Sequence, residues 1–147
     1  MEEFSRTELL IKKEGLEKLQ NSSVAIFGVG GVGGFVIEAL VRAGIGTIHI
    51  VDYDTVSISN LNRQIIATHQ TIDRKKVDVM KERILSINPY CNVKIYDDFF
   101  LPETANHFPF DEFDYIVDAV DTVTAKIKLV EISHEKKIPI ISSMGTG

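Results

Sequence analysis

Apolar positions along this chain follow two spacings. Short apolar or alternating runs, typical of strands, occur at 24–27, 47–51, 93–96, 114–119 and 139–142. Between these runs, apolar residues recur every three or four positions, as on one face of a helix. This spacing predicts helices at 7–19, 33–42, 72–87 and 124–136, and Pro102 indicates a shorter one at 102–105. Strands that alternate with helices indicate right-handed βαβ units, so we expect an α/β fold with a doubly wound, mainly parallel sheet.

Three of these helices carry more specific predictions. The first is expected to begin at a hydroxyl cap, either Ser5 or Thr7. The helix at 72–87 should end at Asn88 before Pro89, and it has one apolar stripe, which consists of Val77, Met80, Ile84 and Ile87. In the helix at 124–136, the residues expected to face the core are Ile127, Val130 and Ile132.

Composition limits the class of protein. With 147 residues, of which 44% are apolar, and no repeat or linker, the chain is expected to form a single domain at 1–147. A net charge of −5 provides no overall attraction to nucleic acid or to a membrane. The single cysteine, Cys91, excludes an internal disulfide and multi-cysteine zinc sites. No apolar run approaches membrane-spanning length and the acidic start is unlike a signal peptide, so we expect a cytoplasmic protein.

A glycine-rich turn follows the first apolar strand. Gly28, Gly30 and Gly33 form a G-x-G-x-x-G pattern between that strand and a helix, which is the context in which the pattern indicates a nucleotide site. Glycines allow a phosphate to approach the backbone, and the N–H groups at the helix N-terminus face the anion. Asp52 follows the next strand, close to the roughly 20-residue spacing of an acid that accepts from ribose hydroxyls. The turn indicates a nucleotide but does not choose between a dinucleotide and ATP.

Further charged residues favour ATP. In an open α/β sheet the ligand lies at the carboxyl ends of the strands, where Asp54, Arg63, Lys76 and Asp121 are also expected. Arg63 and Lys76 suit a triphosphate, because fixed cations stabilise charge on a departing pyrophosphate, whereas NAD has no use for them. Asp121 could hold Mg²⁺ beside the phosphates. This arrangement suggests adenylation.

Simpler interpretations of the same residues stay open. Asp52 and Asp54 could be turn residues, and Asp121 could cap a helix that begins near Val123. Spacing alone favours Lys76 as one of three solvated cations, with Arg74 and Lys75, and favours Arg6 as a solvated charge near the terminus. The four histidines lack ligand spacing, and Cys91 is expected to pack rather than to react.

The chain closely resembles the adenylating domain shared by ubiquitin-activating enzymes and sulfur-carrier adenylyltransferases. The segments that carry this resemblance are 24–64, with Asp52-Tyr53-Asp54-Thr55-Val56 and Asn60-Leu61-Asn62-Arg63-Gln64, then Lys76, Ile87-Asn88-Pro89 and Asp118-Ala119-Val120-Asp121. Within that superfamily, 4–11 and 140–147 resemble the tRNA threonylcarbamoyladenosine dehydratase branch. The resemblance covers nearly the whole chain and implies a Rossmann-like adenylation domain.

The resemblance also implies roles for individual residues. The nucleotide-binding residues would be Gly28, Gly30, Gly31, Gly33, Asp52, Asp54, Asn60, Asn62, Arg63, Gln64 and Lys76. The catalytic residues would be Arg6, Arg63, Lys76 and Asp121, with Asp121 also placing Mg²⁺. Arg6 would enter the ATP site of the neighbouring subunit, which implies a homodimer.

The implied reaction is ATP-dependent activation of the threonylcarbamoyl carboxylate on tRNA adenosine, then ring closure with loss of AMP. Two alternatives stay open: an adenylyltransferase that activates the C-terminus of a ubiquitin-like sulfur carrier, with a sulfur-carrier or sulfur-transfer protein as partner, and a non-catalytic fragment for nucleotide binding or dimerisation.

Three features depart from the resemblance. Lys12 stands where related sequences usually have a small residue. Family members are longer, so we expect the chain to be the N-terminal part of a longer protein; if it ended at Gly147, we would expect ATP binding without turnover. Binding of a tRNA substrate requires Lys and Arg on one face, whereas this chain is net acidic. The basic surface is therefore expected in the remaining part of the longer protein.

Overall fold

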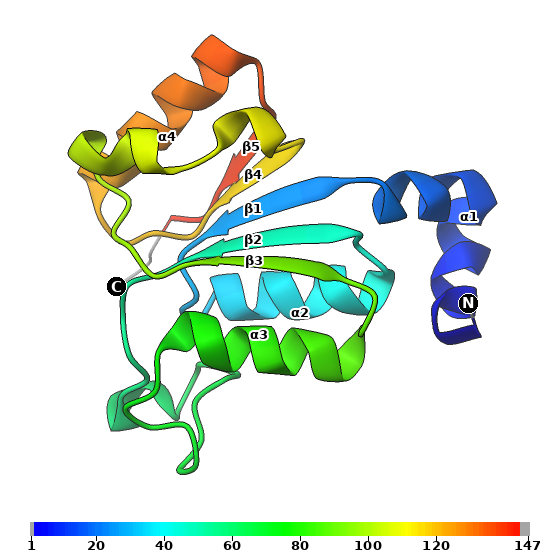
Figure 1. Ribbon diagram of the computed structural model, residues 1–147, viewed down its shortest axis with the longest axis horizontal. Coiled ribbons are helices and arrows are strands. Elements are labelled where there is room, and N and C mark those ends of the chain that lie inside the picture. Colours follow the sequence, from blue (N-terminus) through cyan, green and yellow to red (C-terminus); the bar gives the residue numbers. More distant parts are fainter. Residues whose placement is uncertain (1, 145–147) are drawn as a thin grey trace.

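All five strands run parallel in the computed structural model, which describes residues 2–144. The strands lie in the order β3-β2-β1-β4-β5, so the chain begins in the middle of the sheet and winds outward in both directions (Figure 1). Their bounds are β1 Ser23–Phe27, β2 Thr47–Val51, β3 Asn92–Tyr96, β4 Tyr115–Asp118 and β5 Ile140–Ser142. The predicted doubly wound α/β fold is confirmed.

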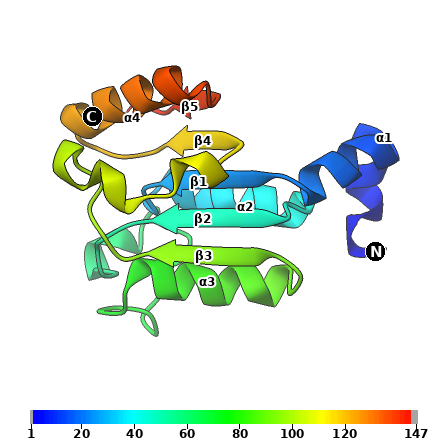
Figure 2. The same cartoon turned by 45° about the horizontal axis from the view of Figure 1, so that its top comes forward.

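Helices cover both faces of the sheet (Figure 1). The α-helices are α1 Ser5–Gln20, α2 Gly33–Ala43, α3 Lys76–Ile87 and α4 Val123–Lys136, and the 3-10 helices are η1 Glu2–Phe4, η2 Ile58–Asn60, η3 Pro102–His107 and η4 Phe110–Glu112. α2 and α3 cover one face, whereas α4, η3 and η4 cover the other (Figures 1 and 2). None of the helices in the part of the chain that the structure describes is long and apolar enough to cross a membrane.

The central strand β1 separates two cores. Successive side chains of a strand point to opposite faces, so Ile26 enters the core beneath α2 and α3, whereas Phe27 enters the core beneath α4. Phe27 contacts a cluster of phenylalanine rings, with centroids 5.0 Å from Phe100 and 5.8 Å from Phe110. Aromatic pairs of this kind add about 0.5–1.5 kcal/mol beyond burial. They fix the irregular segment of η3 and η4 to this face of the sheet.

The starts of α1 and α3 differ from the prediction. No hydroxyl caps α1: η1 runs directly into it, and the cap position is the buried Phe4, without a side-chain hydrogen bond. α3 begins at Lys76 rather than at residue 72, because the preceding residues fold back onto the segment after β2. The N–H of Val56 donates to the carbonyl of Arg74 at 2.8 Å, which a helix starting at 72 would not allow.

The apolar stripe was correct for α3 and mostly wrong for α4. In α3, Val77, Met80 and Ile84 are buried, and the helix ends before Asn88 and Pro89 as predicted. In α4, Ile132 is buried, but Ile127 and Val130 are 55% and 48% exposed. The buried residues are Ala125, Lys126, Leu129, Ile132 and Ser133. The helix turns this face inward because a buried carboxylate of β4, described below, takes the ammonium of Lys126.

Met1, Gly145, Thr146 and Gly147 lie outside the described residues. Part of the resemblance over 140–147 therefore falls on residues whose structure is not described here.

Candidate functional site

The glycine turn between β1 and α2 contains two glycines that the fold itself requires. Gly28 has a φ of +100°, and a Cβ atom there would lie 2.5 Å from the carbonyl oxygen of Ala119. A Cβ atom at Gly33 would lie 1.7 Å from the carbonyl oxygen of Gly28. At Gly30 and Gly31 the nearest atoms would be 3.7 Å and 3.6 Å away, which is ordinary contact. The protein's own packing therefore gives no reason for glycine at these two positions, whereas a ligand that approaches the backbone does.

The start of α2 presents backbone donors at the same place. Val32, its cap residue, makes no side-chain capping bond. Within residues 2–144, no acceptor takes the N–H groups of Gly30, Gly31 or Val32. Free N–H groups at the positive end of a helix form a seat for an anion such as phosphate.

Asp52, which follows β2, is held against the turn. Its Oδ2 accepts from the N–H of Val29 at 2.7 Å, and its Oδ1 accepts from the N–H of Asp54 at 2.8 Å. Burial raises the pKa of Asp52, while these two hydrogen bonds and the nearby charge of Lys76 act in the opposite direction. Oδ1 thus makes the local hydrogen bond that is typical of a turn residue, whereas Oδ2 links the end of β2 to the glycine turn.

The loop from Ser57 to Gln64 is shaped by Asn60. Its Oδ1 accepts from the N–H of Ser57 at 2.9 Å, and its carbonyl oxygen accepts from the N–H groups of Arg63 and Gln64. Asn60 is 9% exposed, so it acts from inside the loop. Asn60 therefore fixes the backbone of the loop that carries Arg63 and Gln64, both of which lie near the glycine turn.

Arg63 lies over that turn. Its Cγ is 3.6 Å from the position of a Cβ on Gly31, and its guanidinium donates to the carbonyl of Ser59 at 3.0 Å and to Oδ1 of Asn62 at 2.9 Å. The side chain is exposed, and its aliphatic stem is the part that contacts the glycine turn. Asn62 holds the guanidinium in this position.

Gln64 contributes an unsatisfied polar atom. Its amide nitrogen is the group beside Gly30, and its Oε1 is buried without a hydrogen-bond partner, the one such side-chain atom in residues 2–144. Buried polar atoms almost always have a partner, so an orphan here indicates a missing donor such as a ligand or an ordered water.

Lys76 is buried, contrary to the expectation from spacing. Only 5% of the residue is exposed, and its Nζ lies 3.9 Å from Oδ2 of Asp54. The cations at the two preceding positions are at the surface and pair with acids there, Arg74 with Glu82 and Lys75 with Asp97. Lys76 differs because its N–H donates to the carbonyl of Asp54, which fixes the first turn of α3 against the end of β2.

Asp121 lies on the segment between β4 and α4, which packs against the glycine turn. The N–H of Ala119 in this segment donates to the carbonyl of Phe27 at 2.9 Å. Asp121 is exposed, and the cap position of α4 is Thr122, which makes no side-chain capping bond. Residues 2–144 contain no cluster of three or more metal-ligating side chains. A single carboxylate still fits Mg²⁺, which usually keeps waters and phosphate oxygens as its other ligands.

Arg6 is the predicted site residue that the structure does not bring to this edge. It belongs to α1, which lies beyond the amino ends of the strands, whereas the glycine turn follows the carboxyl end of β1 (Figure 2). Arg6 therefore cannot join the site of its own chain.

Sequence reasoning missed two groups at this edge. Asp118 was expected at this edge, at the end of a buried strand, but was given no role, and Lys126 was not singled out; the structure pairs them in the interior. The available signal was a lysine within the apolar face formed by Ala125, Leu129 and Ile132. His49 and Cys91 are buried, and burial raises the pKa of the Cys91 thiol to about 11, as expected for a packing cysteine.

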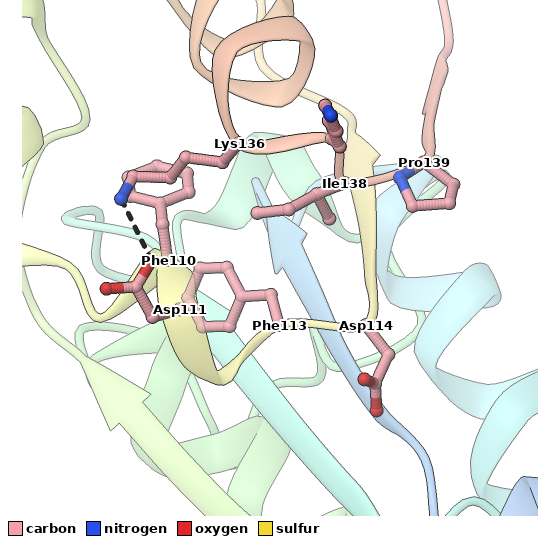
Figure 3. A pocket seen from close by; sticks show the side chains of 8 residues that line it. Phe110, Asp111, Phe113, Asp114, Lys136, Ile138 and Pro139 are labelled. Carbon is pink, nitrogen blue, oxygen red and sulfur yellow. Dashed lines mark hydrogen bonds and ion pairs between the residues drawn. The ribbon is translucent and has the colours of Figure 1, made fainter.

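A cavity of about 210 Å³ lies at the opposite edge of the sheet, between η4 and the connection from α4 to β5 (Figure 3). Of its four charged lining residues, Lys136 pairs with Asp111 at 2.9 Å, and Asp114 accepts from the N–H of Ser23. The cavity shares no lining residue with the candidate site.

Comparison with known proteins gives consistent results. A model of the ThiF family matches residues 4–147. The chain is 50% identical over 145 residues to tRNA threonylcarbamoyladenosine dehydratase of Bacillus subtilis (strain 168), covering 99% of this chain and 57% of that protein. It is 37% identical over 144 residues to the protein of that name from Escherichia coli (strain K12), covering 98% and 54%.

A solved structure agrees. The crystal structure of the E. coli dehydratase TcdA in complex with ATP matches with a TM-score of 0.96 at 36% identity, over 99% of this chain and 60% of that one. The chain thus spans about half the length of the curated relatives it matches.

Proposed function

The chain belongs to the ThiF family, and on that premise we propose that it is the ATP-binding part of an enzyme that adenylates a carboxylate. The relatives' name indicates the substrate: the threonylcarbamoyl group on a tRNA adenosine. In the proposed reaction an oxygen of its carboxylate attacks the α-phosphorus of ATP and pyrophosphate leaves. The activated carbonyl is then attacked from within the same group, which closes a ring and releases AMP. A tRNA substrate would place the enzyme in the cytoplasm.

The observation that carries this proposal is the bare surface at Gly30 and Gly31. Neither glycine is required by the packing of the chain. Within residues 2–144 the backbone N–H groups of both have no acceptor, and Gly30 lies beside the side-chain amide of Gln64, whose Oε1 is unsatisfied. A phosphate chain explains why these positions lack side chains, and an amino or hydroxyl donor of the nucleotide or of bound water would satisfy Gln64.

The cations around the turn suit the departure of pyrophosphate. Arg63 lies above Gly31, and Lys76 approaches from α3 with little water around it. Both charges are in place before reaction, so they can stabilise the developing negative charge without reorganisation. Asp52 retains lone pairs for ribose hydroxyls beside its bond to Val29, and Asp54 holds Lys76 from the exposed side.

Mg²⁺, when bound, would neutralise phosphate oxygens. Asp121 is the residue that we propose for holding it, because its carboxylate is exposed on the segment that packs against Gly28.

We further propose a homodimer in which Arg6 of one subunit completes the ATP site of the other. The position of α1 beyond the amino ends of the strands supports this assignment, since Arg6 lies on the side of its own sheet away from the glycine turn.

A second acceptor has one observation in its favour. The chain carries a net charge of −5, which does not attract a polyanion such as tRNA. Activation of the C-terminus of a sulfur-carrier protein would use the same ATP site without a basic surface. For the tRNA substrate, we propose that the basic surface belongs to the part of the relatives that this chain does not span.

Exchange of labelled pyrophosphate into ATP tests these candidates. We expect the full-length protein to catalyse exchange that modified tRNA stimulates. Stimulation by a sulfur-carrier protein alone would select the second acceptor. ATP binding by calorimetry without exchange under any condition would leave only a non-catalytic nucleotide-binding module.

A further inference from the structure

The ammonium group of Lys126 joins three segments at the carboxyl edge of the sheet. Its Nζ lies 3.2 Å from both carboxylate oxygens of Asp118 at the end of β4, and it donates to the carbonyl of Ser143 after β5 at 2.7 Å. Asp118 is fully buried and Lys126 is 8% exposed, so this pair is in the protein interior.

Stability alone does not explain a buried ion pair. Moving two charges out of water costs several kcal/mol per ion, and a well-packed apolar pair of similar volume often gives equal or greater stability. The surrounding residues of α4, such as Ala125 and Leu129, already provide an apolar interface that a nonpolar side chain could extend. The pair therefore calls for a role in geometry.

That geometry concerns the segment 119–122. At its start, Oδ1 of Asp118 accepts from the N–H of Val120 at 3.2 Å. At its end, the carbonyl of Thr122 accepts from the backbone N–H of Lys126 at 3.1 Å. The segment is thus held at its start by the side chain of Asp118 and at its end by the first backbone bond of α4, and Asp121 lies between these two points.

Ser143 is bonded to the same pair through both of its backbone groups. Its N–H donates to the carbonyl of Asp118 at 2.9 Å, and its carbonyl accepts from Lys126. The segment after β5 is therefore fixed to the same point as the segment that carries Asp121.

We propose that Lys126 is a positioning residue: paired with Asp118, it holds the segment 119–122 so that the carboxylate of Asp121 meets the Mg²⁺ of bound ATP. This inference rests on the proposed function. Lys126 touches neither nucleotide nor metal in this account, and its effect on the reaction passes through Asp118 and Asp121. Loss of the pair should release the segment without removing any group that contacts the substrates.

The test uses the full-length protein with a double variant, Asp118→Val with Lys126→Met, which removes both charges and also the acceptor for the N–H of Val120. A matched control, Glu38→Gln with Arg83→Met, removes an ion pair of 2.7 Å between α2 and α3, away from the carboxyl edge. Three quantities are measured: Tm, hydrogen exchange of the amides of residues 119–122, and the Mg²⁺ concentration for half-maximal pyrophosphate exchange.

For the double variant we expect a Tm close to that of the control, with amide exchange and half-maximal Mg²⁺ both raised about tenfold, the scale of one lost restraining hydrogen bond. The control should change neither. Lys126→Arg, which keeps the charge and two donors, should restore both values. Amide exchange and Mg²⁺ dependence equal to wild type in the double variant would overturn the proposal.

Two further outcomes are also decisive. If the double variant does not fold, Asp118→Asn with Lys126→Gln serves in its place, since it removes both charges and keeps a polar group at each position, and smaller shifts in the same direction are expected. If the wild-type protein shows no pyrophosphate exchange, the adenylation function fails, whereas hydrogen exchange of 119–122 still decides whether the pair fixes that segment.

Discussion

Gly33 packs onto Gly28 so closely that a Cβ atom added to Gly33 would lie 1.7 Å from the carbonyl oxygen of Gly28. This contact brings the start of α2 against the end of β1 and sets the curvature of the turn between them. Gly30 lies within the same turn but has no atom within 3.6 Å of a Cβ position. The turn thus contains a glycine that the fold needs and a glycine whose only evident use is a ligand.

The first prediction compares these two glycines. Gly33→Ala should reduce the free energy of unfolding by about 3 kcal/mol or more, because backbone atoms cannot move aside easily. Gly30→Ala should leave stability within about 0.5 kcal/mol of wild type and abolish ATP binding. Denaturant unfolding and calorimetric titration with ATP measure the two effects. Tight ATP binding by Gly30→Ala would show that the phosphates do not lie on this turn.

The second prediction concerns Lys76. Replacement by Met should keep the fold, since the aliphatic stem stays buried, and should slow pyrophosphate exchange by about 10²–10³-fold, the usual effect of losing one fixed group that stabilises transition-state charge. Lys75→Met is the control, because that ammonium pairs with Asp97 on the surface. Equal rates for the two variants would remove Lys76 from the reaction.

Lys76 also shows how far sequence reasoning extends. The alternation of strands and helices was sufficient to predict the fold. Each helix packs one face against the sheet, and this packing produces the periodicity of apolar residues in the sequence. The sequence could not show which of Arg74, Lys75 and Lys76 is buried. That depends on the backbone hydrogen bond from Lys76 to Asp54, two residues that lie 22 positions apart in the sequence. Side-chain burial set by long-range contacts cannot be deduced from local spacing.

The predicted orientation of α4 was wrong for a similar reason. Periodicity placed Ile127 and Val130 inward, but the buried carboxylate of Asp118 required a cation and turned Lys126 toward the sheet. One charge pair outweighed two apolar side chains at the helix surface. A polar group in the core therefore changed an assignment that hydrophobicity alone would have decided.

The third prediction follows from Lys12, whose backbone lies at φ 63° and ψ 170° inside α1. This region is essentially limited to glycine, and a residue with a side chain there is strained by about 1–3 kcal/mol. The expectation that related sequences have a small residue here thus has a physical basis. Lys12→Gly should raise the free energy of unfolding by that amount, whereas Lys13→Gly, at an ordinary helical position, should lower it by about 1 kcal/mol. Thermal unfolding of the two variants checks the sign.

The fourth prediction concerns pH. His49 is 1% exposed and hydrogen-bonded to Tyr96 at 2.9 Å and to Ser23 at 3.0 Å, and burial lowers its pKa from 6.5 to about 4. A histidine with a lowered pKa must stay neutral in the folded state, so its contribution is complete above pH 6.5 and is lost as the pH falls toward 4. The total loss should be about 3 kcal/mol.

His49→Gln removes the titrating group and keeps polar atoms for both hydroxyls. Denaturant unfolding between pH 7 and 5 should show a decline for the wild type that is clearly smaller for the variant. Parallel declines would mean that other groups cause the pH dependence.

The fifth prediction tests whether Arg6 acts on the neighbouring subunit. Arg6→Ala and Arg63→Ala should each abolish pyrophosphate exchange, because one loses the arginine given to the partner and the other loses the arginine of its own site. In a mixed dimer, the subunit with Arg6→Ala has an intact Arg63 and receives Arg6 from its partner, so one of its two sites is complete. Random reassortment of equal amounts should therefore restore about a quarter of wild-type activity, since half of the dimers are mixed. If Arg6 acted within its own chain, or if the protein were a monomer, the mixture would stay inactive at every ratio, and sedimentation of the mixture would distinguish those two cases.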